Sequence, residues 1–224
     1  MRYIRPMSVL PDRSTRHSTV AMALRTAALV NVLADPAAGP GEVAAVLLAH
    51  GEPAPVEVTA EDVTGLRAAA VHLREVFAAG SADEAAALLN SLLAAHTGPL
   101  RLTSHGGTAP WHPHADADDD APWTAWFRAS GCLSLTVLLW ERQAPPGRTC
   151  ASASCGNVFV AHGSGPERRY CSRRCATRER VAAHRRAQTT TAAGARAGGG
   201  APPGPPPRGG GAGGWGGGGG RGLG

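Results

Sequence analysis

Hydrophobic residues recur at steps of three and four along much of residues 18–143, which is the spacing of one buried helix face. The clearest segment is 58–80, whose regularly spaced apolar positions are Val63, Leu66, Ala70, Leu73 and Phe77. Its start resembles a capping box, because Thr59 and Asp62 stand three positions apart just before the apolar stripe. The same pattern predicts further helices over residues 18–35, 39–51, 81–98 and 121–143.

Residues 99–116 depart from the helical spacing. Polar and apolar residues alternate there around Gly106 and Gly107, which favours a β-hairpin. We therefore expect a mainly α fold of α+β type, in which a helical N-terminal domain carries one β-hairpin.

Composition divides the chain into four parts. Residues 1–18 are polar and predict a flexible lead-in, and residues 19–143 are the expected helical domain. Residues 188–224 hold 17 glycines and 5 prolines, so this segment buries too little apolar surface to offset its ordering entropy. It is predicted to be a disordered tail. Between these parts lies a segment, 148–187, that differs from the rest in charge and in cysteine content.

Charge is divided unevenly along the chain. All 22 basic residues are arginine. Residues 1–147 carry 10 arginines against 15 acidic residues, whereas residues 148–187 carry 9 arginines against 2 glutamates. This concentration indicates a polyanionic partner, most simply nucleic acid. One alternative is docking onto an acidic protein or onto the acidic N-terminal domain of the same chain. A second is that the arginines are simply solvated on the surface of a small module.

The N-terminus lacks the pattern of a secretory leader, because arginines interrupt it at four positions between residues 2 and 16. The longest apolar run lies near residues 132–140, and it is shorter than the roughly 20 residues that a membrane-spanning helix needs. We therefore expect a cytoplasmic protein, and in that compartment paired cysteines more often bind metal than form disulfides.

Four of the five cysteines stand in two close pairs, Cys150 with Cys155 and Cys171 with Cys175. Tight loops of three or four residues bring both sulfurs of a pair to one side, and Zn²⁺ takes four such ligands. The sequence therefore predicts a zinc site made by these four thiols. A redox or disulfide device is an alternative, although neither pair has the Cys-x-x-Cys spacing of thioredoxin-type sites. Cys132, in an apolar helix, is expected in the core.

The residues around the cysteines predict a small ββα finger. The run VFV at 158–160 indicates a strand, 162–166 a turn, 167–170 a returning strand and 176–188 a basic helix. His162, in the turn, is an alternative zinc ligand. A unit this small has too little core to fold alone, so bound metal would supply its folding energy.

This segment resembles the CGNR-type zinc finger. The resemblance is carried by the cysteine pairs, by RRYCS at 168–172 and by CATRERVAAHRR at 175–186. The chain departs from the family in having Cys-Ala-Thr-Arg at 175–178 where the family has Cys-Gly-Asn-Arg, and in the short Cys-x3-Cys spacing of its second pair.

Residues 24–143 resemble the ABATE domain that precedes this finger in its family. The resemblance is carried by ALVNVLAD at 28–35, by LRLTSHGGTAPWHPH at 100–114 and by the tryptophan-containing helix that follows. Members of the family are described as transcription regulators, some of them stress-induced. The resemblance implies a bacterial, nucleoid-associated regulator.

Arginines of the predicted basic helix gather on one side. Arg174, Arg178 and Arg185 fall within about 40° of one another on a helix. Further arginines add charge near the metal, at Arg168, Arg169 and Arg173. A helix anchored by zinc can enter the major groove of double-stranded DNA, where arginine contacts phosphates or guanine. The predicted function is zinc-dependent DNA binding in transcriptional control.

A rival interpretation starts from His112 and His114, which share one face if their segment is a strand. Two such imidazoles could begin a catalytic metal site, with the finger serving as a protein-interaction module. We favour a structural histidine pair beside Trp111, and we interpret 118–120 as a solvated acidic loop. Because the sequence has no GxSxG, HExxH or phosphate-binding glycine motif, we expect no enzymatic activity.

A third interpretation combines the two parts of the chain. The N-terminal domain would bind a small-molecule effector around Asn31, Trp111 and His112, and the finger would bind DNA.

Overall fold

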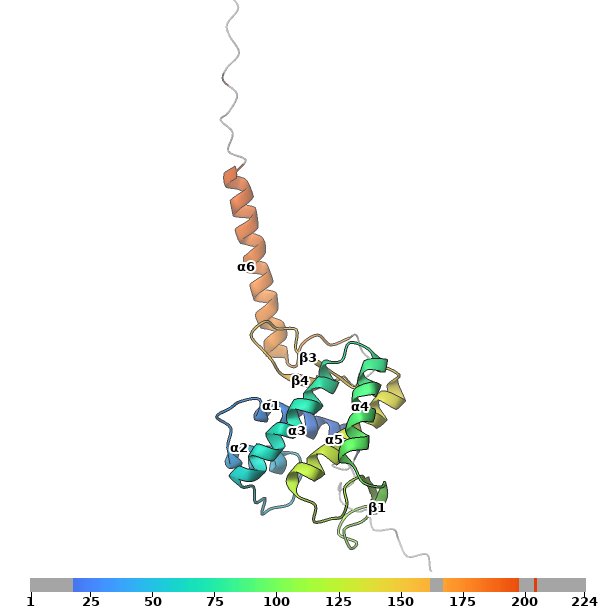
Figure 1. Ribbon diagram of the computed structural model, residues 1–224. Coiled ribbons are helices and arrows are strands. Elements are labelled where there is room, and N and C mark those ends of the chain that lie inside the picture. Colours follow the sequence, from blue (N-terminus) through green and yellow to red (C-terminus); the bar gives the residue numbers. More distant parts are fainter. Residues whose placement is uncertain (1–17, 162–166, 198–203, 205–224) are drawn as a thin grey trace, which may run out of the picture. The chain divides into compact units, whose positions relative to one another are not determined.

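The computed structural model describes residues 18–161, 167–197 and 204 of the chain. It is mainly helical, with two small two-stranded hairpins, as expected (Figure 1). The elements in chain order are α1 (Thr19–Leu33), α2 (Pro40–Ala49), α3 (Ala60–Ala78), α4 (Ala82–His96), β1 (Arg101–Thr103), β2 (His112–His114), α5 (Trp123–Arg142), β3 (Gly147–Thr149), β4 (Val158–Val160) and α6 (Arg173–Ala197). The chain divides into two compact units, Met1–Val181 and Ala182–Gly224, with the boundary inside α6.

Three of the predicted helix starts are confirmed by capping bonds, those of α1, α3 and α4. Thr59 and Asp62 form the reciprocal bonds of a capping box, because the Thr59 N–H donates to Asp62 Oδ2 (2.9 Å) and the Asp62 N–H to Thr59 Oγ1 (3.1 Å). Ser18 accepts from the N–H of Ala21 (3.2 Å), and Ser81 caps α4 in the same way. These bonds satisfy N–H groups that a helix start otherwise leaves without partners.

Helix α5 lies at the centre of the first unit and packs on α1, α3 and α4. The apolar stripe predicted for α3 is buried at every position, and Cys132 of α5 is buried among these residues, as expected. Gly131 permits the close approach of α5 to α3, because a Cβ there would lie 3.0 Å from Leu73 Cδ1. The packing of α5 on α3 therefore requires a residue without a side chain at Gly131.

The predicted hairpin at 99–116 is confirmed as the antiparallel pair β1–β2. Its register sets Arg101 opposite His114 and Thr103 opposite His112. Asp119 does not belong to a merely solvated loop, because its carboxylate accepts hydrogen bonds from Arg101 (2.6 Å) and Thr103 (2.8 Å). The acidic loop before α5 thus holds the first strand of this hairpin.

The finger hairpin is formed by a different strand pair from the one we predicted. Strand β4 pairs with β3, and the described residues 167–170 form no strand. The expected turn at 162–166, including His162, lies outside the described residues. The pattern of 147–149 gave little indication of a strand, since it is only three residues long and contains a glycine.

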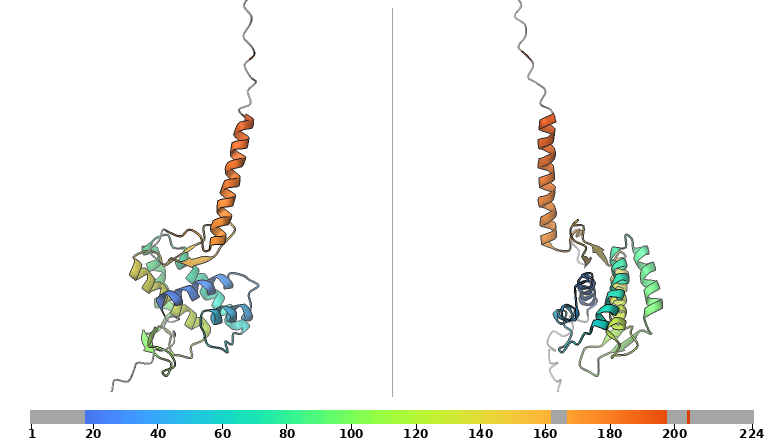
Figure 2. Two further views of the ribbon diagram at one scale, coloured as in Figure 1. Left: turned by 180° about the vertical axis from the view of Figure 1, so that it is seen from behind. Right: turned by 60° about the vertical axis from the view of Figure 1, so that its left-hand side comes forward.

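Hairpin β3–β4 packs against α1 and α3, at the end of the helices away from β1–β2 (Figures 1 and 2). Val158 and Val160 are buried within the same apolar core as the helices. Gly147 allows this packing, because a Cβ at this position would stand 2.1 Å from Cδ1 of Phe77. The hairpin of the finger is therefore part of the first unit's core.

Helix α6 is longer than predicted, since it begins at Arg173 and continues to Ala197. Its last residues, 188–197, overlap the segment that we predicted to be a disordered tail, and of the rest of that tail only Gly204 is described. The predicted lead-in lies outside the described residues, except for Ser18. None of the helices that the structure describes is long and apolar enough to cross a membrane.

Candidate metal centre

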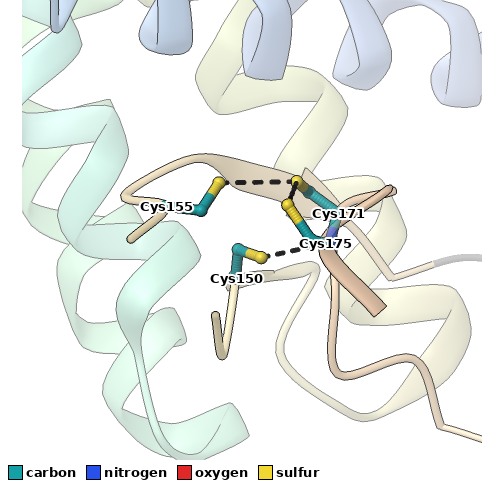
Figure 3. A group of neighbouring side chains, drawn as sticks. All are labelled: Cys150, Cys155, Cys171 and Cys175. Atoms are coloured by element: carbon teal, nitrogen blue, oxygen red, sulfur yellow. Dashed lines mark hydrogen bonds between the residues drawn. The ribbon is translucent and has the colours of Figure 1, made fainter. Parts of the chain in front are cut away.

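The four cysteines of the finger come from two parts of its chain, the loop between β3 and β4 and the start of α6. Cys150 follows β3, Cys155 lies in the loop before β4, Cys171 precedes α6, and Cys175 stands in the first turn of that helix. Figure 3 shows the four side chains pointing toward one another. The fold therefore brings together all four residues that the sequence predicted as zinc ligands.

The four sulfur atoms lie close enough together to bind one zinc ion. All four Sγ atoms lie within 4.8 Å of one another. Cys171 Sγ is 3.7 Å from the sulfurs of both Cys155 and Cys175. Since Zn–S bonds are about 2.3 Å long, tetrahedral coordination separates sulfurs by about 3.8 Å. The cluster is consistent with Zn²⁺.

Backbone hydrogen bonds hold the two cysteine loops in place. The Cys155 N–H donates to the carbonyl of Ser152 (2.9 Å), which closes the first loop. The N–H of Ala151 donates to the carbonyl of Arg169 (2.8 Å), which ties that loop to the second. The Cys171 N–H points at Cys150 Sγ (3.4 Å), an interaction that stabilises negative charge on the sulfur.

The pKa values of two of the thiols are shifted in opposite directions. The Ser172 side chain, helped by the neighbouring thiols, lowers the pKa of Cys175 to about 7, whereas burial raises the pKa of Cys171 to about 12. One thiolate thus forms readily near neutral pH while a neighbouring thiol keeps its proton. A divalent cation replaces such protons and stabilises all four thiolates, so the affinity for zinc falls as the pH falls.

Two residues of α6 reach back to the first cysteine loop. Glu179 accepts hydrogen bonds from Ser152 Oγ (2.8 Å) and from the N–H of Ala153 (3.3 Å). The Arg178 guanidinium donates to Ser154 Oγ. The role of Glu179 was not predicted from the sequence. A single acidic residue within a strongly basic helix would have indicated it. These hydrogen bonds fix the start of α6 to the metal cluster.

The six arginines that we predicted to contact nucleic acid are all exposed: Arg168, Arg169, Arg173, Arg174, Arg178 and Arg185. Arg168 lies over the Phe159 ring (5.1 Å to its centre) and donates to the carbonyl of Cys171 (3.0 Å). Arg180, which sequence reasoning did not single out, is exposed as well. Arg185 belongs to the second unit of the chain.

A basic hollow lies beside the metal cluster. Arg168, Arg169 and Arg173 line it, together with Tyr170 and Ser172. Arg169 also lies over the Tyr170 ring, 5.8 Å from its centre. The hollow thus combines three cations, a hydroxyl group and an aromatic ring next to the start of α6.

The structure separates the three residues proposed to bind an effector. The Asn31 amide bonds the backbone of Val158, with Nδ2 donating to the carbonyl (2.9 Å) and Oδ1 accepting from the N–H (2.7 Å). Trp111 is 73% exposed, and His112 is buried. A cavity of about 290 Å³ includes His112 among its lining residues but neither Asn31 nor Trp111.

Comparison with protein families identifies the metal-binding segment. Residues 147–188 match the family model of the CGNR zinc finger. No curated protein matches the chain. The segment is thus a CGNR zinc finger with a four-cysteine cluster, which indicates a zinc-binding protein.

Proposed function

We propose that this protein binds double-stranded DNA through its zinc finger and acts in transcriptional control. The observation that carries the proposal is the exposure of six arginines of the finger, none of which forms an ion pair within the described part of the chain. Exposed cations concentrated in one short segment of the chain attract a polyanion and release its counterions on binding.

The basic hollow supports phosphate binding. Arg173 and Arg174 occupy the first turn of α6, where the positive end of the helix dipole disfavours further cations. A phosphate group bound there offsets this electrostatic repulsion, because its negative charge pairs with both the arginines and the helix N-terminus. Tyr170 and Ser172 add a ring and a hydroxyl group to the same surface.

The acidic N-terminal domain is a weaker candidate as partner. The described interactions of β3–β4 with α1 and α3 are apolar, as with Val158, or are hydrogen bonds to the backbone, as from Asn31 and Arg74. Within the finger, Arg148 pairs with Glu167 of the same module. None of these interactions uses the six exposed arginines, which supports an external polyanion as their partner.

The resemblance of residues 24–143 to the ABATE domain stays part of the proposal. In this proposal the helical domain senses a small molecule, and the finger carries the response to DNA. The cavity lined by His112 is the place we assign to that effector.

The DNA proposal is tested by the salt dependence of binding. We expect the zinc-loaded chain to bind duplex DNA at low ionic strength, with affinity falling steeply as salt rises. Replacing Arg168 and Arg173 together by alanine should weaken binding and flatten the slope by about 0.9 log units for each DNA phosphate that the variant no longer neutralises. Fluorescence anisotropy of labelled duplexes over a salt series measures both quantities.

Arg142→Ala is the matched control, because Arg142 is exposed at the end of α5 and is not one of the six arginines of the proposal. We expect this variant to keep the wild-type slope. Absence of binding by zinc-loaded wild type, or equal slopes for the double variant and the wild type, would contradict the proposal.

A further inference from the structure

Three histidines converge on one point at the end of the helices away from the finger. His112 and His114 share a face of β2, and His105 approaches from the turn that follows β1. His112 Nε2 lies 3.2 Å from Nε2 of His105 and 3.0 Å from Nε2 of His114. The ligand nitrogens of all three lie within 4.8 Å of one another.

The other ring nitrogen of each histidine faces an oxygen acceptor. His112 Nδ1 lies 2.7 Å from the Pro110 carbonyl, and His114 Nδ1 lies 2.9 Å from Asp116 Oδ1. His105 Nδ1 lies 3.2 Å from Asp119 Oδ2. A carbonyl and two carboxylates only accept hydrogen bonds, so each Nδ1 carries the proton. Each Nε2 of a neutral ring then presents a lone pair to the centre.

Lone pairs from three rings repel one another at this separation unless a cation lies between them. An extra proton can bridge one pair of nitrogens, but a metal ion satisfies all three. Zn–N bonds of about 2.0–2.1 Å in a tetrahedral site separate nitrogens by about 3.3–3.4 Å, close to the spacing found here. The carboxylates of Asp116 and Asp119, which face the Nδ1 atoms, resemble the hydrogen-bond partners that orient metal-bound histidines in other proteins.

The surroundings hold this arrangement firmly. Arg101 pairs with both Asp116 (2.8 Å) and Asp119 (2.6 Å), so it fixes the two carboxylates that orient His114 and His105. Thr103 Oγ1 also donates to Asp119 Oδ2 (2.8 Å), so this carboxylate is held from two sides. His105 has a left-handed backbone (φ 47°), a conformation uncommon for a residue other than glycine. Such strain is often retained where it positions a functional side chain.

We propose that His105, His112 and His114 form a second metal site, for a divalent transition metal of the Zn²⁺ type. Three neutral imidazoles leave the ion its full double charge and one open coordination position. The cavity of about 290 Å³ is lined by all three histidines, so that position faces the cavity. Water or a small anionic ligand from the cavity completes the coordination.

The cavity also has an aromatic and charged part. The buried Arg25 lines it, with its guanidinium 4.4 Å from the centre of the Trp126 ring, and Glu52 pairs with Arg25. A ligand coordinated to the metal therefore shares the cavity with an aromatic ring and an ion pair. This site is independent of the finger and of DNA binding, and it gives the histidine pair a role different from the structural one we favoured from the sequence.

The test is a zinc titration of the full chain whose finger already holds one equivalent, with a competing chelator to report affinity. We expect wild type to bind one further equivalent. His105→Asn and His112→Gln should bind it at least about 10-fold more weakly, since even loss of a supporting residue costs 10–100-fold. Asparagine tolerates the left-handed backbone of His105, which preserves the turn. His72→Ala, an exposed histidine on α3, is the control and should bind like wild type.

Cobalt(II) distinguishes the two sites by their spectra. The second cobalt equivalent should give visible bands without the near-ultraviolet thiolate-to-cobalt charge transfer that the finger produces. Circular dichroism of each variant checks that it is folded. The proposal is overturned if wild type takes up no second equivalent, if the folded variants bind it as tightly as wild type, or if its spectrum carries the thiolate band.

Discussion

At the scale of single residues, Asn31 shows how one side chain joins the finger to the helices. Its amide makes both hydrogen bonds with Val158 that a neighbouring strand would make, and thus extends the small sheet from the α1 side. Val158 is 1% exposed, so its backbone groups have little access to water as substitute partner. Asn31 therefore has a structural task that the sequence did not indicate.

Asn31→Ala is predicted to destabilise the chain by about 1–3 kcal/mol, because it leaves buried backbone groups of Val158 without partners. Chemical denaturation followed by circular dichroism measures this destabilisation. Asn90→Ala, at an exposed position of α4, serves as control and should change stability by less than about 0.5 kcal/mol. Equal stability of the two variants would show that the Asn31 bonds contribute little.

At the scale of elements, the packing of β3 on α3 depends on a glycine. Gly147 stands against Phe77, whose ring is fully buried in the core of the helices. A side chain at this position must displace either the ring or the strand. This close approach explains why a strand that sequence reasoning did not foresee is fixed beside α3.

Gly147→Ala is predicted to cost about 1–3 kcal/mol, since an added methyl group overpacks the space beside Phe77. Thermal unfolding should show a lower Tm for this variant. Gly41→Ala makes a suitable comparison, because a Cβ at Gly41 of α2 meets no atom within 4 Å. Should Gly147→Ala unfold at the wild-type temperature, the close packing of β3 on Phe77 would be refuted.

At the scale of the whole molecule, two stabilising systems meet in the finger. The cysteine loops and the start of α6 depend on the four-sulfur cluster, whereas β4 is held by the apolar core of the helices. We therefore expect the metal to organise the cysteine loops and the start of α6, and the apolar core to hold β4 irrespective of zinc.

Removing zinc by chelation, or by Cys171→Ser, should open the cysteine loops and the first turns of α6 while α1, α3 and β4 stay protected. Thiolates without a cation repel one another, and the loops have few apolar neighbours to replace the metal. Hydrogen exchange resolved along the chain measures this difference. Chelator added to Cys171→Ser should cause no further opening at these loops; unchanged protection of the loops in metal-free protein would contradict a structural metal.

The sequence by itself determined the helices and the cysteine cluster. Capping pairs such as Thr59 with Asp62, and apolar steps of three and four, involve residues within about one helical turn of each other. They can therefore be recognised from the local sequence. The close cysteine pairs are local for the same reason. Only the tertiary structure decided the partner of β4, the task of Asn31 and the addition of His105 to the histidine pair. Each of these depends on interactions between separate segments, whose geometry is set by packing of the whole core and not by the residues beside them in the chain.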